Sequence, residues 1–173
     1  EVMTGALDRR VRSLYVMGEN PMLSDPNLEH VEEALRALDF LVVQEIFLSE
    51  TAQLAHVVLP AASWLEKDGT KTNTERRVQL IHPVLQTPGE ARPDWWIVAE
   101  LGKRLEGLLG RMAAGRRTID EGSAAGARHW GYSSPAQITD EIASVSPAYR
   151  GIVHRRLGDA GLVWPCPSED HPG

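Results

Sequence analysis

The chain has 173 residues, of which 42% are hydrophobic and 24% charged, and its formal net charge is −6. This length corresponds to about one domain and is sufficient to bury a hydrophobic core. The negative charge argues against binding to nucleic acid or to an anionic membrane surface, because both require a basic patch. No apolar run reaches the roughly 20 residues of a membrane span. The single cysteine, Cys166, excludes an internal disulfide framework and a cysteine-rich metal cluster, and it fits a reducing cytoplasm.

Short apolar segments alternate with amphipathic segments over the first sixty residues. Three of the apolar segments are predicted strands: Val11–Met17, Phe40–Val43 and His56–Leu59. A helix is predicted over residues 26–38, with Asp25 as its cap, and another over residues 50–55, with Ser49 as its cap. This order predicts an α/β fold with a mostly parallel sheet and helices on both faces, that is, a three-layer doubly wound domain.

The second half of the chain is less regular. Residues 61–75 are predicted to form a long loop, Arg76–Ile81 a further strand, and a strong helix is predicted to start at Pro93. Residues 110–131 are rich in Gly, Ala, Arg and Ser, which indicates a flexible insertion or linker.

Ser134-Pro-Ala-Gln137 is typical of a helix start, and the tail from Trp164 carries three prolines, so it is expected to be extended. We therefore expect three parts. They are an α/β domain (1–109), a linker (110–131) and a mostly helical segment with an extended tail (132–173).

Polar residues follow the first two predicted strands at their carboxyl ends, where open α/β sheets bind ligands. Asn20 belongs to the turn Gly18–Pro21, and its amide can both donate to and accept from a base or phosphate. The tetrapeptide alone favours a plain Asn-Pro turn. Gln44 and Glu45 follow the second strand, where a carboxylate can accept two hydrogen bonds from guanine. The alternative is a solvent-facing glutamate at a helix entrance.

Two further charged residues are candidates. Lys67 lies in the loop Trp64–Gly69 and suits a phosphate or a pterin oxygen, while Asp94, in a first helical turn, suits a ligand amino group. Taken singly, Lys67 is more simply explained as a solvated lysine, and Asp94 as a carboxylate that complements the helix dipole. We expect the fold to gather Asn20, Gln44, Glu45 and Lys67 into one crevice. The chain contains no Walker motif and no GxGxxG, so neither an ATP site nor a Rossmann-type NAD site is indicated.

The order and wording of these motifs over residues 10–109 closely resemble the molybdopterin oxidoreductase family. The shared motifs are a Gly-x-Asn/Asp-Pro turn, a Thr-Ala helix, an Ala-x-x-x-Leu-Pro strand, a Trp-x-Glu-x-x-Gly loop, an Asn-x-x-Arg-Arg segment and an Asp-Trp helix start. In this chain they are Gly18–Pro21, Thr51–Ala52, Ala55–Pro60, Trp64–Gly69, Asn73–Arg77 and Arg92–Trp95. The tail Gly161–Pro167 is similar to the formate dehydrogenase branch of the family.

This resemblance implies part of the large subunit of a molybdenum-dependent formate dehydrogenase, which oxidises formate to carbon dioxide and passes electrons to iron–sulfur clusters. It implies bis(molybdopterin guanine dinucleotide) carrying molybdenum or tungsten, with Asn20, Gln44, Glu45, Lys67 and Asp94 at cofactor-contacting positions. Glu45 departs from the aspartate that most relatives carry there.

In the family, the molybdenum ligand and the cysteines of the 4Fe–4S clusters lie upstream of the matched segment. The resemblance also implies a second cofactor-binding domain downstream, to which the tail of this chain would lead. We therefore expect this chain to contain no catalytic or metal-binding residue and to be inactive alone. Its implied partners are the other domains of the same polypeptide and electron-transfer subunits, with no nucleic acid and no membrane contact by this segment.

Three other interpretations stay open at this point. A nitrate reductase-like enzyme of the same family would share many of these motifs, and here the tail favours the formate branch. Some complex I subunits resemble the family without binding molybdenum, but the presence of Asn20, Lys67 and Asp94 together favours a cofactor site. An α/β domain that binds an unrelated nucleotide is the third.

Overall fold

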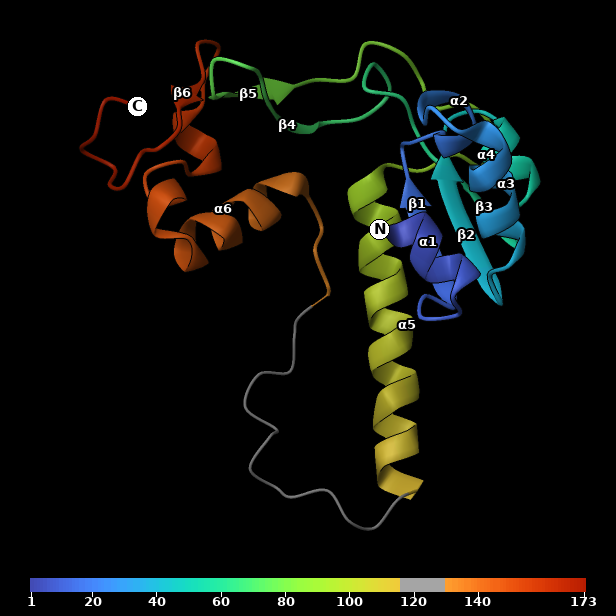
Figure 1. Ribbon diagram of the computed structural model, residues 1–173. Helices are drawn as coiled ribbons and strands as arrows, with labels where there is room; N and C mark the ends of the chain where they lie inside the picture. The colour runs from blue at the N-terminus through green and yellow to red at the C-terminus, as the bar shows by residue number, and fades with distance from the viewer. Residues whose placement is uncertain (116–129) are drawn as a thin grey trace. The chain divides into compact units, whose positions relative to one another are not determined.

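The computed structural model describes residues 1–115 and 130–173, which form two compact units (Figure 1). Unit 1 comprises Glu1–Ser63 and Thr87–Arg92, and unit 2 comprises Trp64–Gln86 and Pro93–Gly173. The predicted domain of residues 1–109 is thus divided between both units. Each unit has its own hydrophobic cluster and is described separately.

A three-stranded parallel sheet forms the centre of unit 1. Its strands lie in the order β1 (Ser13–Met17), β2 (Phe40–Glu45) and β3 (Val57–Pro60). Both pairings are parallel, which confirms the predicted α/β fold with a parallel sheet. The register places Met17 opposite Gln44 and Glu45 opposite Pro60, so the carboxyl ends of all three strands lie at one edge of the sheet.

Four helices belong to the same unit: α1 (Val2–Leu7), α2 (Pro21–Ser24), α3 (Leu28–Arg36) and α4 (Glu50–Gln53). Helix α1 is not among the elements predicted from the sequence. Ala6 of α1, Leu35 of α3 and Ala52 of α4 share one core with Leu41 and Val43 of β2. Side chains alternate between the faces of a strand, so Leu41 and Val43 lie on the face that these helices cover.

The helix predicted over residues 26–38 starts later and has a different cap. The side chain of Asn27 accepts a hydrogen bond from the backbone N–H of His30 at 3.3 Å, so Asn27, not Asp25, caps α3. Pro21 begins the separate helix α2, because proline is tolerated at the first helical position. The predicted cap of α4 is confirmed, since the Ser49 hydroxyl accepts from the N–H of Ala52.

Unit 2 contains a small antiparallel sheet and several helices. The sheet has the order β4 (Gly69–Thr72), β5 (Arg77–Ile81) and β6 (Leu162–Val163). The helices are α5 (Asp94–Gly115), α6 (Pro135–Val145) and the short 3-10 helices η2 (Pro147–Tyr149) and η3 (His154–Arg156).

Three predictions for this part of the chain need correction. Residues 61–75 are predicted to be a loop, but they contain strand β4. The Gly-Thr-Lys-Thr sequence of this strand has no apolar alternation that would predict it, and the strand forms by pairing with β5. Helix α5 continues to Gly115, six residues into the predicted linker, and residues 116–129 lie outside the described part. The tail is not extended: it folds back, and Cys166 packs with no exposed surface against Val78, Ile152, Leu157 and Leu162.

No helix within the described residues is long and apolar enough to cross a membrane.

The core of unit 1 can be tested at Leu41, whose side chain is fully buried. We expect Leu41→Ala to lower the free energy of unfolding by about 2–5 kcal/mol, because it removes apolar contacts and leaves a cavity. The matched variant Leu23→Ala trims a leucine that is 73% exposed and should change stability by less than about 0.5 kcal/mol. Urea denaturation followed by circular dichroism measures both, and equal effects would contradict the assigned core.

Candidate functional site

The carboxyl edge of the parallel sheet in unit 1 begins at Gly18, directly after β1. Gly18 has φ = 64°, a left-handed conformation that favours glycine, and its N–H donates to the backbone carbonyl of Gln44 at 2.9 Å. A Cβ built on Gly18 would meet no atom within 4 Å. The backbone at this point therefore faces open space and can be approached closely by a ligand.

The side chain of Asn20 ties the loop after β1 to the start of α4. Its Oδ1 accepts hydrogen bonds from the Thr51 hydroxyl at 2.6 Å and from the Thr51 N–H at 3.3 Å. Its Nδ2 donates to Oε2 of Glu50 at 2.8 Å. The Thr51 hydroxyl in turn accepts from the N–H of Met22 at 3.1 Å. Both ends of the Asn20 amide are thus bound within unit 1.

The hydrogen bond from Asn20 also acts on Glu50. That bond is the main cause lowering the pKa of the Glu50 carboxyl below its ordinary value, and the backbone N–H of Glu50 adds to it. Asn20 therefore stabilises a negative charge in the first turn of α4. In this geometry, Asn20 fixes two neighbouring loops of the sheet edge in position.

The bond between Asn20 and Thr51 can be tested by a nearly isosteric change. Thr51 is fully buried, and Thr51→Val removes the hydroxyl that donates to Asn20 and accepts from Met22. We expect the free energy of unfolding to fall by about 1–3 kcal/mol, because buried polar groups lose partners. Thr74→Val makes the same change at an exposed position and should have little effect in the same denaturation experiment. A neutral Thr51→Val would show that the network is dispensable.

Gln44 and Glu45 are consecutive residues, so their side chains point to opposite faces of the sheet. Gln44 has no exposed surface, and its Oε1 accepts a hydrogen bond from the hydroxyl of Tyr15. Glu45 is half-buried, and its Oε1 accepts from the N–H of Ile46 at 2.7 Å. This local bond orients the longer glutamate side chain and leaves its carboxylate at the sheet edge with further capacity to accept hydrogen bonds.

The loop between β2 and α4 carries a feature that the sequence analysis did not single out. Three consecutive apolar side chains, Ile46, Phe47 and Leu48, are exposed there. They form an unbroken apolar run between a strand and a helix. This run is visible in the sequence and could have marked the loop as a candidate contact surface.

Lys67 and Asp94 form an ion pair within unit 2. Both side chains are partly buried, with 23% and 31% of their surfaces exposed. They line a pocket of about 220 Å³ with Trp95, Ile138 and Thr139. The indole Nε1 of Trp95 is buried and has no hydrogen-bond partner among the described residues. The pocket thus combines a cation, a carboxylate, an unpartnered donor and an apolar wall.

The structure brings the predicted site residues together in two groups. Asn20, Gln44 and Glu45 lie at the carboxyl edge of the sheet in unit 1, as predicted. Lys67 and Asp94 form their own pair in unit 2. The single crevice expected to include Lys67 stays a prediction.

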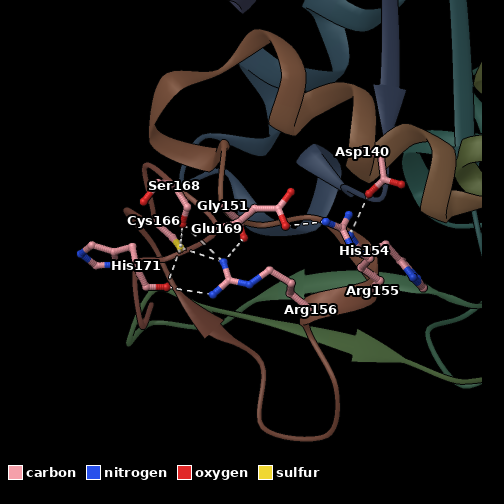
Figure 2. A network of polar contacts seen from close by, with 9 residues as sticks. All are labelled: Asp140, Gly151, His154, Arg155, Arg156, Cys166, Ser168, Glu169 and His171. Atoms are coloured by element: carbon pink, nitrogen blue, oxygen red, sulfur yellow. Dashed lines mark hydrogen bonds and ion pairs between the residues drawn. The ribbon is translucent and has the colours of Figure 1, made fainter.

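Cys166 lies in a network of polar contacts formed by the folded tail (Figure 2). The Arg156 guanidinium donates to the carbonyl oxygens of Gly151 at 2.5 Å and His171 at 2.8 Å, and it lies 3.6 Å from the Cys166 sulfur. A Cβ on Gly151 would lie 2.0 Å from the carbonyl oxygen of Ser168, so only glycine allows the tail to approach this closely. The surroundings of Cys166 are those of a structural cysteine.

Arg156 should therefore contribute to stability. We expect Arg156→Ala to lower the free energy of unfolding by about 1–3 kcal/mol, because the carbonyl groups of Gly151 and His171 lose a charged donor. Arg155, one residue earlier, pairs with Glu169 at the surface, and Arg155→Ala should cost about 1 kcal/mol or less. Thermal and urea unfolding of both variants measure the difference, and indistinguishable variants would refute a structural role for Arg156.

The sheet edge of unit 1 presents groups that can bind a ligand. Within residues 1–115 and 130–173, no group of three or more His, Cys, Asp and Glu side chains is arranged to hold a metal ion. The sheet edge offers an open backbone at Gly18 and an acceptor carboxylate at Glu45, which fit a nucleotide. The chain thus has an α/β fold with a parallel sheet, and ligands of open α/β sheets bind at the carboxyl ends of the strands.

A family model described as molybdopterin oxidoreductase matches residues 1–104, so the chain belongs to the molybdopterin oxidoreductase family. The chain is 49% identical over 165 residues to the F420-dependent formate dehydrogenase subunit alpha of Methanocaldococcus jannaschii, covering 95% of this chain and 22% of that protein. It is 45% identical over 172 residues to the F420-dependent formate dehydrogenase 1 subunit alpha of Methanococcus maripaludis, covering 99% of this chain and 23% of that protein. The chain thus spans less than a quarter of the length of these relatives.

A solved structure supports the fold. Acetylene hydratase from Pelobacter acetylenicus matches 80% of this chain and 17% of its own chain, with a TM-score of 0.60 and 22% sequence identity. At this identity the likeness concerns the α/β fold alone.

Proposed function

We propose that this chain is part of the catalytic subunit of a molybdenum-dependent formate dehydrogenase and contributes to binding bis(molybdopterin guanine dinucleotide). The observation that carries this proposal is the half-buried carboxylate of Glu45 at the carboxyl edge of a parallel sheet, beside the open backbone of Gly18. Carboxylate oxygens accept hydrogen bonds from the N1–H and the amino group of guanine. Membership of the molybdopterin oxidoreductase family supports the choice of cofactor.

When bound, the molybdenum (or tungsten) cofactor supplies the redox chemistry by which formate is oxidised to carbon dioxide. The residues of this chain bind and orient it. Glu45 accepts from the base, while Asn20 and Gln44 act through their neighbours: Asn20 holds Thr51 and Glu50, and Gln44 holds Tyr15.

The pocket of unit 2 provides a second set of contacts in this proposal. The ammonium of Lys67 offsets the charge of Asp94 and of an anionic ligand group. The carboxylate of Asp94 accepts from an amino group, and the buried Nε1–H of Trp95 is a donor without an acceptor among the described residues. These groups fit the polar edge of a pterin.

Formate is favoured over other substrates of the family because the relatives at 49% and 45% identity are formate dehydrogenase alpha subunits. The sequence of the tail points the same way, against a nitrate reductase-like enzyme or a complex I subunit without molybdenum. By the same reasoning, 4Fe–4S clusters belong to other parts of the polypeptide, and electron-transfer subunits are its partners. The chain on its own is inactive in this proposal, and its cytoplasmic location stays a prediction.

The proposal is tested in the complete catalytic subunit. We expect Glu45→Ala to lower the content of molybdenum and guanine nucleotide about tenfold, because a charged acceptor to the base is lost. Glu45→Asp, which keeps the carboxylate on a side chain that is one methylene shorter, should retain the cofactor. Metal analysis and nucleotide release by acid hydrolysis give both contents per polypeptide.

Glu33→Ala is the matched control, since Glu33 is an exposed glutamate of α3 in the same unit. It should leave the cofactor content unchanged. If Glu45→Ala also retains full occupancy, Glu45 does not bind the cofactor and the proposed site is wrong.

A further inference from the structure

The loop between β2 and α4 presents three consecutive apolar side chains to solvent. Ile46 is 47% exposed, Phe47 75% and Leu48 67%. Hydrogen bonds hold this loop at both ends: the N–H of Ile46 donates to Glu45 and the N–H of Ser49 donates to the carbonyl of Phe47 at 2.9 Å. The apolar run is therefore part of an ordered turn that leaves the apolar surface uncovered.

The position of this turn restricts what can cover it. It starts directly after Glu45, at the edge of the sheet where Gly18 also leaves its backbone open. A polypeptide segment covering the turn would also take water from the Glu45 carboxylate, and that is unfavourable unless the segment brings donors. A purine base satisfies both requirements at once, because it has a flat apolar face and N–H groups along its edge.

We propose that the ring of Phe47 stacks on the guanine base of the bound nucleotide while Glu45 accepts hydrogen bonds from the edge of the same base. The inference rests on the proposed function and adds a binding residue to it. Aromatic side chains are common stacking platforms for bases, since every base has a π face. Ile46 and Leu48 flank the base and shield it from water.

The experiment uses the complete catalytic subunit with three substitutions at one position: Phe47→Ala, Phe47→Leu and Phe47→Tyr. The readout is the guanine nucleotide released by acid hydrolysis per polypeptide, before and after prolonged dialysis. Phe47→Ala should lower the retained nucleotide about tenfold, because the stacking face is lost. Phe47→Tyr should behave like the unmodified protein, and Phe47→Leu should be intermediate. Leu23→Ala removes an equally exposed apolar side chain from α2 and should have no effect.

Two outcomes would overturn the inference. Full retention by Phe47→Ala would show that the ring does not contact the base. Full retention of guanine nucleotide by Phe47→Leu, together with a lower melting temperature of Phe47→Ala, would show that the turn packs against protein.

The Glu45→Ala subunit, measured in parallel, separates this inference from the proposed function. Loss of nucleotide from Glu45→Ala with retention by Phe47→Ala refutes only the stacking contact. Absence of guanine nucleotide from the unmodified subunit refutes both.

Discussion

The parallel pairing of β1, β2 and β3 is the constraint on which the candidate site depends. Parallel strands direct their carboxyl ends to the same edge of the sheet. The residues that follow β1, β2 and β3 therefore lie along one edge, although they are far apart in the sequence. The pairing holds because Leu41 and Val43 of the central strand are fully buried against helices on one face. A shift of register by one residue would turn Leu41 and Val43 away from the helices and would place Gln44 on the face that the helices cover.

A second layer of organisation is polar. Asn20 receives two hydrogen bonds from Thr51 and gives one to Glu50, and it thereby joins the loops that follow β1 and β2. Buried polar groups that are fully paired make a local structure rigid, since any alternative leaves them without partners. The asparagine of the Gly-x-Asn-Pro turn thus supports the sheet edge.

Unit 2 illustrates how charge is handled when it is partly removed from water. Lys67 is paired with Asp94 beside an apolar wall, and Arg156 donates to the carbonyl oxygens of Gly151 and of His171 in the folded tail. In both places a cation has an oxygen partner of the same unit, as the cost of burying a charge requires. The lysine and the carboxylate in the pocket therefore neutralise each other's charge.

The sequence by itself determined the features that depend on neighbouring residues. The three parallel strands and the Ser49 cap follow from short apolar runs and local hydrogen bonds, and the motifs of residues 10–109 carry the resemblance to the family. Tertiary structure decided the rest, because it depends on partners far apart in the chain. Asn20 meets Thr51 across 31 positions, Lys67 meets Asp94 across 27, and β4 becomes a strand only by pairing with β5. Cys166 is buried because the tail folds onto η3, whose Arg156 satisfies its carbonyl groups, and no local pattern in a proline-rich segment specifies that contact.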